Sequence, residues 1–128
     1  MPRKLKFSRL SRSFAICRLN PGAVIPDWAA HGTFFSVTST AEELSVVCEE
    51  AQVPAHVPHE GDWVCLKLEG PFPFSETGIL TSFVQPLSER AIPVFAISTF
   101  DTDYVLVKHG WLDRAVEALR DAGHEEVL

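Results

Sequence analysis

Acidic side chains stand in two short polar segments of this 128-residue sequence, and their setting suits the binding of a small zwitterion. Ser75-Glu76-Thr77-Gly78 precedes an apolar pattern of helical spacing, and Ser98–Asp103 carries Asp101 and Asp103 between two apolar runs. Unpaired amides at a helix N-terminus favour a carboxylate, and a nearby acidic side chain favours an ammonium or guanidinium group. If the two segments converge, they form a seat for an amino acid, and the small Gly78 leaves room for its approach.

The same residues also have a purely structural interpretation. Ser75 would cap the helix, and Glu76 would complement the dipole of its first turn. Asp103 would cap the turn between the two apolar runs. Both interpretations are compatible with the residue types.

Hydrophobic periodicity in the second half predicts the elements that must position these segments. Val94–Ile97 is apolar at every position, which predicts a strand buried on both faces. The first expected elements are a strand Trp63–Leu68 and a helix from about Glu76 to Arg90, kinked at Pro86. The next are the strands Val94–Ile97 and Tyr104–Val107. A helix over 111–122, ended by Gly123, and a short strand within His124–Leu128 complete the series. This β-α-β-β-α-β order predicts an α+β, ferredoxin-like fold with both helices on one face of an antiparallel sheet.

The first half reads as a reduced version of the same arrangement, with its helices shrunk. Leu5–Leu10 and Phe14–Leu19 are predicted to pair as a hairpin around Ser11-Arg12-Ser13. At most one helical turn is expected at Pro26, followed by strands Thr33–Thr38 and Leu44–Cys48. The proline-containing segment 49–62 is read as a linker, which places the halves at 1–60 and 61–128. A sheet with one open face favours side-by-side pairing of sheets, either between the two halves or between two chains, and we expect a homodimer.

Composition bounds the partners and the location. Residues 1–12 carry five basic and no acidic side chains within a chain of net charge −6, so the remainder is strongly acidic and no nucleic-acid partner is expected. The basic segment could be a binding tail, but the alternation of Lys4–Phe7 favours a strand. No apolar run reaches the length of a membrane span, so no membrane partner is expected. The odd cysteine set, without a C-x-x-C, predicts buried free thiols in a reducing, cytoplasmic location; the cysteines are Cys17, Cys48 and Cys65.

Catalytic and metal-binding signatures are weak. His56 and His59, with Glu60 and Asp62 nearby, could suggest a metal site, but they fall in a proline-broken segment that reads better as a surface loop. The sequence contains no P-loop, dinucleotide fingerprint, G-x-S-x-G or H-E-x-x-H motif. We therefore expect neither an enzyme nor a cofactor.

The segment Ile92–Val107, taken with Trp63–Gly70 and the Ser75–Arg90 helix, resembles the ACT domain family of amino-acid-sensing regulatory modules. The resemblance is to the branch that holds small bacterial tandem-ACT proteins and the cytosolic arginine sensor of the animal TOR pathway. It is clear over residues 62–123. The first half, through Phe14–Leu19 and Ile25–Trp28, looks like the N-terminal ACT-like half of those bacterial proteins.

The resemblance implies a function and a set of ligand contacts. An E-x-G motif at a helix start is matched by Glu76-Thr77-Gly78, and a T-F-x-x-D motif after a strand is matched by Thr99–Asp103. It implies tandem ACT-like halves and a non-catalytic regulatory protein that binds an amino acid where two ACT units meet. An interaction or oligomerisation module without a metabolite ligand is the alternative. The implied contacts are Glu76, Thr77, Gly78, Ile79, Ser98, Thr99, Phe100, Asp101 and Asp103.

Overall fold

The computed structural model describes residues 3–128, and their contacts divide them into two compact units. Unit 1 combines the described residues up to Ser11 with Val64–Leu128, and unit 2 is Arg12–Trp63. Strands β1 (Lys6–Leu19) and β4 (His59–Leu68) each contribute residues to both units. The division therefore differs from the predicted halves 1–60 and 61–128, because the start of the chain packs with the C-terminal unit.

Unit 1 follows the predicted order of strand, helix, strand, strand, helix and strand. After β4 come α1 (Ile79–Glu89), β5 (Phe95–Ser98), β6 (Asp103–Lys108), a 3-10 turn η3 (His109–Trp111), α2 (Leu112–Asp121) and β7 (Glu125–Glu126). The strands lie in the order β1-β4-β6-β5, and β7 pairs with β1 in parallel. The fold is a mixed α/β arrangement on a largely antiparallel sheet.

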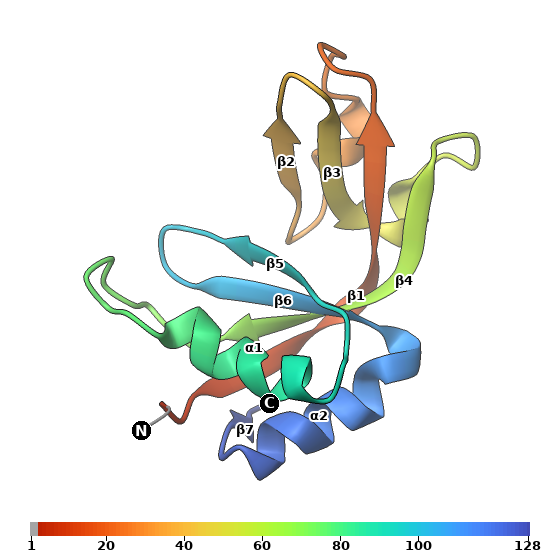
Figure 1. The fold of residues 1–128 in the computed structure, drawn as a ribbon. Coiled ribbons are helices and arrows are strands. Elements are labelled where there is room, and N and C mark those ends of the chain that lie inside the picture. The colour runs from red at the N-terminus through yellow and green to blue at the C-terminus, as the bar shows by residue number, and fades with distance from the viewer. Residues whose placement is uncertain (1–2) are drawn as a thin grey trace. The chain divides into compact units, whose positions relative to one another are not determined.

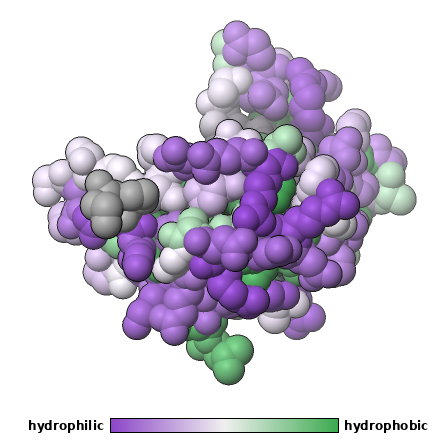
Figure 2. All heavy atoms as spheres, turned by 60° about the horizontal axis from the view of Figure 1, so that its bottom comes forward, coloured by the Kyte–Doolittle hydropathy of each residue, from purple (hydrophilic) through white to green (hydrophobic). Residues whose placement is uncertain are grey.

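Helices α1 and α2 lie on the same face of this sheet, and their apolar stripes build its core (Figure 1). Ile79, Phe83 and Leu87 recur every four residues along α1, so all three side chains face the sheet and are buried. Phe7 of β1 meets Phe83 edge to face, with ring centroids 5.3 Å apart. Each fully buried side chain of this size contributes roughly 1.5–3 kcal/mol. The face of the molecule that Figure 2 shows is mostly hydrophilic.

The two α-helices differ in how well the sequence predicted their ends. Gly123, at φ +96°, ends α2 as predicted: its amide donates to Arg120 O and the next amide to Leu119 O. The predicted N-cap of α1 at Ser75 is wrong. The N-cap is Gly78, at φ +80°, and the helix begins at Ile79. Ser75 lies instead in a turn that the Glu76 amide closes on the Pro73 carbonyl, at 3.0 Å.

The predicted hairpin within residues 5–19 is also wrong. Lys6–Leu19 is one continuous strand, and Phe14–Leu19 pairs with Leu44–Glu49 of β3 instead. Ser11-Arg12-Ser13 contains no glycine, asparagine or proline to favour a tight turn, and its side chains stay exposed. Its polarity marks the place where β1 passes from one unit to the other.

Strand β5 corrects a third expectation. The run Val94–Ile97 was expected to be buried on both faces, yet Ala96 and Ser98 are exposed and Val94 is 38% exposed. The cause is its position at the edge of the sheet, beside β6 but beyond the buried centre. Hydrophobicity alone does not distinguish an edge strand from a central one.

Unit 2 is built around the antiparallel strands β2 (Ser36–Ser39) and β3 (Leu44–Glu49) and the second part of β1. Short 3-10 turns, η1 (Asp27–Ala29) and η2 (Glu50–Gln52), stand where helices would lie, and η1 follows Pro26 as predicted. Strand β2 is shorter than the predicted Thr33–Thr38. Cys17 and Cys48 are buried in this core, and contact with the Cys48 thiol together with burial raises the pKa of Cys17.

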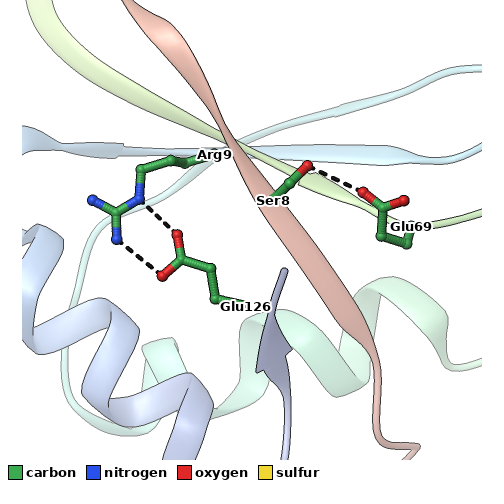
Figure 3. A network of polar contacts seen from close by, with 4 residues as sticks. All are labelled: Ser8, Arg9, Glu69 and Glu126. Atoms are coloured by element: carbon green, nitrogen blue, oxygen red, sulfur yellow. Dashed lines mark hydrogen bonds and ion pairs between the residues drawn. The ribbon is translucent and has the colours of Figure 1, made fainter. Parts of the chain in front are cut away.

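Side-chain hydrogen bonds connect the first part of β1 to the rest of unit 1 (Figure 3). Ser8 and Arg9, consecutive on the strand, point to opposite sides and reach Glu69 and Glu126 respectively. The Arg9 guanidinium meets the Glu126 carboxylate through two hydrogen bonds, of 2.6 and 3.0 Å. The hydrogen bond from Arg9 lowers the pKa of Glu126 below its ordinary range.

Two features are missing from the described part of the chain. No helix between residues 3 and 128 has the length and apolar character needed to cross a bilayer. Within the same residues, no three His, Cys, Asp or Glu side chains gather so that they could hold a metal ion.

Candidate functional site

A hollow of about 230 Å³ lies in unit 1, where the loop before α1 meets the β5–β6 turn. Seven of the nine predicted site residues line it, whereas Thr77 and Gly78 do not. The lining residues are Phe72, Pro73, Phe74, Glu76, Ile79, Ser98, Thr99, Phe100, Asp101, Thr102 and Asp103. The two acidic segments of the sequence thus face one space.

The turn between β5 and β6 is rigidly hydrogen-bonded. The Thr99 amide and hydroxyl both donate to Thr102 O, at 2.8 and 3.0 Å. At the last pair of the ladder, the Ser98 hydroxyl donates to a carboxylate oxygen of Asp103 at 2.5 Å. The Asp103 carboxylate is therefore held at the edge of the hollow by a neighbour from the facing strand.

The loop that follows β4 is fastened to the same turn. The Phe72 amide donates to Asp101 O at 2.8 Å, and the buried Thr102 hydroxyl donates to Leu68 O at 2.8 Å. A Cβ at Gly70 would lie 2.9 Å from Asp101 O, so this close approach requires glycine. Sequence reasoning missed Gly70 and Thr102 as positioning residues. The signal available was Gly70 within a proline-rich loop next to a strand end.

Three carboxylates form the acidic wall of the hollow, and they differ in their interaction partners. Glu76 forms an ion pair with Arg3, which sequence reasoning also missed as a site residue. Asp103 accepts the Ser98 hydroxyl. The Asp101 side chain is exposed and makes no hydrogen bond or ion pair with another of the described residues. Carboxylates at such a wall attract an ammonium or guanidinium group.

Aromatic side chains form the rim of the hollow. Phe74 and Phe100 meet edge to face at a centroid distance of 4.8 Å, although they are 76% and 78% exposed. Phe72 lies deeper and packs against the core of unit 1. Exposed rings beside carboxylates offer an apolar surface for a ligand's methylene groups and a face for its cation.

The start of α1 borders the hollow through Ile79. Its N-cap, Gly78, makes no side-chain capping bond, and an added Cβ there would meet no atom within 4 Å. The first-turn amides therefore carry the partial positive charge of the helix without a side-chain cap from Gly78. This is the type of group that binds a ligand carboxylate.

A second hollow, of about 210 Å³, shares Thr99, Asp101 and Thr102 with the first. Lys67, Glu69 and Tyr104 contribute its other polar side chains. Lys67 thus places a cation in the second hollow, beside the β5–β6 turn. The Ser8 hydroxyl holds Glu69 at 3.1 Å.

Comparison with protein families matches the part of the chain that holds the hollow. A model described as ACT domain matches residues 59–121, which include all the lining residues. The chain belongs to the ACT domain family. A second model, of an N-terminal domain, matches residues 12–56, close to the bounds of unit 2.

Relatives of this ACT protein include a solved structure of similar size. Protein Atu0741 from Agobacterium tumefaciens is 41% identical, with a TM-score of 0.93 over 98% of this chain and 94% of that one. The bovine cytosolic arginine sensor for mTORC1 subunit 1 is 28% identical over 112 residues, covering 73% of this chain and 34% of that protein. Human CASTOR3P is 32% identical over 87 residues, covering 58% of this chain and 53% of that protein. The chain thus spans about half or less of these curated relatives.

More distant structures share the fold. The regulatory subunit of aspartate kinase from Thermus flavus superposes with a TM-score of 0.62 at 12% identity, over 94% of this chain and 99% of that one. At such low identity the likeness concerns the fold alone.

Proposed function

We propose that this ACT protein is a non-catalytic regulatory protein that binds an amino acid in the hollow of unit 1. One observation carries the proposal: Glu76, Asp101 and Asp103 converge with the start of α1 around a single space. Membership of the ACT domain family and the likeness to a protein named as an arginine sensor support a regulatory role.

The chemistry of the lining suggests how the ligand would lie. Its carboxylate would accept hydrogen bonds from the first-turn amides of α1 near Ile79. Its α-ammonium group would pair with Asp103 and Asp101, a cationic side chain would reach Glu76, and its methylene groups would lie on Phe100. Arginine is the first ligand to test, because the wall is acidic and a relative carries that name.

Calorimetric titration and thermal shift with arginine and the other common amino acids test this proposal. A ligand at 100 times its Kd should stabilise the protein by about 2.7 kcal/mol. Asp103→Asn should weaken binding at least tenfold, whereas Glu117→Gln, on the exposed face of α2, should leave it unchanged. Binding to none of the amino acids, or equal effects of the two variants, would contradict the proposal.

We further propose that unit 2 is a reduced ACT-like half and that the protein forms a homodimer. The 3-10 turns η1 and η2 and the antiparallel strands of unit 2 support the first part. The edge strand β5 supports the second, because unpaired strand edges readily pair with another chain. The three buried thiols support the proposal of a reducing, cytoplasmic location.

The same edge strand favours a second candidate function, an interaction module without a metabolite. In that case β5 would dock a partner enzyme or a second copy of the chain by strand addition. Sedimentation with and without arginine separates the candidates. A dimer indifferent to all amino acids supports the interaction module, and a shift in assembly or stability with ligand supports the sensor.

A further inference from the structure

A guanidinium group of the chain pairs with one of the carboxylates that line the hollow. The Arg3 side chain forms an ion pair with the Glu76 carboxylate, although 73 residues separate them in sequence. Glu76 lines the hollow, and its side chain is 31% exposed. One carboxylate of the proposed ligand site is therefore already paired with a cation of the type that an amino-acid side chain would bring.

Hydrogen bonds of Arg3 itself and of Leu5, two residues later, hold this segment in place. Its own amide donates to the Ser82 hydroxyl on α1 at 3.3 Å. Two residues later, the buried Leu5 donates its amide to the ring of His124 at 3.0 Å and accepts the Glu125 amide at 2.9 Å. The segment before β1 is thus anchored to α1 and to the end of unit 1, which keeps the Arg3 side chain within reach of Glu76.

We propose that Arg3 is a specificity-determining residue of the hollow. It neutralises Glu76, so that a ligand cation must displace Arg3 to reach that carboxylate and meets a like charge on the way. Asp101 and Asp103 have no such cationic partner among the described residues, and they remain available to an α-ammonium group. Arg3 therefore reduces the preference of the site for a cationic side chain over a neutral one. This inference rests on the proposed amino-acid site.

Arginine and citrulline provide matched probes, since they share length and shape and differ in charge at the end of the side chain. Arg3→Gln should tighten the binding of arginine by roughly twofold to fivefold, the range expected for an exposed ion pair. It should leave the Kd of citrulline unchanged. Arg90→Gln is the matched control, because Arg90 pairs with Asp121 at 2.7 Å, outside the hollow, and is similarly exposed.

A third variant, Glu76→Gln, isolates the carboxylate for which the two cations compete. In that background Arg3→Gln should give a smaller gain for arginine than it gives in the wild-type protein. Equal shifts for both ligands, or no change in their Kd ratio, would overturn the role of Arg3 while leaving the site intact. Absence of binding heat for both ligands in every variant would overturn the proposed function, and this inference with it.

Discussion

Replacement of His124 should destabilise unit 1 more than its position near the chain end suggests. The imidazole is 3% exposed, and its Nδ1 accepts the Leu5 amide at 3.0 Å. Because Nδ1 is the acceptor, Nε2 carries the hydrogen and donates to Ser82 O at 2.9 Å. That carbonyl needs a donor because Pro86, four residues later in α1, has no N–H. His124 thus replaces a helical hydrogen bond that the proline removes.

His124→Phe keeps a ring against Phe83, whose centroid lies 5.5 Å from that of the imidazole, but it removes both hydrogen bonds. Each buried backbone group left without a partner costs about 1–3 kcal/mol. We therefore expect a loss of roughly 2–5 kcal/mol in the free energy of unfolding, measured by guanidinium titration with circular dichroism. His109→Phe, at an exposed position, should change it by less than about 0.5 kcal/mol.

A double-mutant cycle with Pro86→Ala tests the reason for the loss. Alanine restores an N–H that can donate to Ser82 O, so His124→Phe should cost about 1 kcal/mol less in that background. The single substitution at residue 86 removes a proline from a helix interior and shifts stability by itself, but the cycle subtracts this effect. Strict additivity of the two substitutions would refute the argument that His124 serves the carbonyl freed by Pro86.

Three further outcomes follow from local chemistry. Arg9→Ala should lower the free energy of unfolding at pH 7 by about 0.5–1 kcal/mol. Because the hydrogen bond from Arg9 lowers the pKa of Glu126 in the folded state, this contribution is present above the ordinary glutamate pKa and is lost as pH falls through the lowered folded pKa. The denaturation midpoints of wild type and variant should therefore converge once the pH is below that folded pKa. Gly123→Ala should cost about 1 kcal/mol or more in thermal or chemical unfolding, since φ is +96° and a Cβ would lie 3.0 Å from the Lys4 side chain. Burial raises the pKa of Cys65 to about 12, so iodoacetamide at pH 8 should label it only in denaturant, as mass spectrometry of peptides would show.

Periodicity was sufficient to predict the elements of unit 1 because their amphipathic faces are regular. Ile79, Phe83 and Leu87 mark one stripe of α1, and all three are buried. At Gly123 the sequence requirement and the structure coincide, since a left-handed residue at that position favours glycine. Here local pattern and tertiary packing select the same conformation, so the sequence is informative.

Local pattern failed where a neighbour in space decides the conformation. Ser75 is a good capping residue, but it lies in a turn that the Glu76 amide closes on the Pro73 carbonyl. The helix therefore begins later, and Gly78 is its N-cap. Ser11-Arg12-Ser13 reads as a turn, but pairing on both sides keeps β1 extended. The all-apolar Val94–Ile97 reads as central, but the strand order places it at an edge. Each error concerns information that the local sequence does not contain.

The candidate site shows the same division between local and distant information. Its acidic residues could be named from the sequence, because carboxylates beside a helix start suggest a ligand whatever the fold. Arg3 could not be placed beside Glu76, because only the return of the chain start to unit 1 joins residues so far apart. The roles of Gly70 and Thr102 likewise depend on one loop lying against another.

A single irregularity in α1 connects these observations. Pro86 leaves the Ser82 carbonyl without its helical donor, and His124 supplies one. The same ring then uses its other nitrogen to hold the Leu5 amide, two residues after the arginine that pairs with Glu76. One chain of contacts thus runs from Pro86 through His124 to the segment that carries Arg3. Substitution of His124 is therefore expected to affect both the stability of unit 1 and the Arg3–Glu76 ion pair.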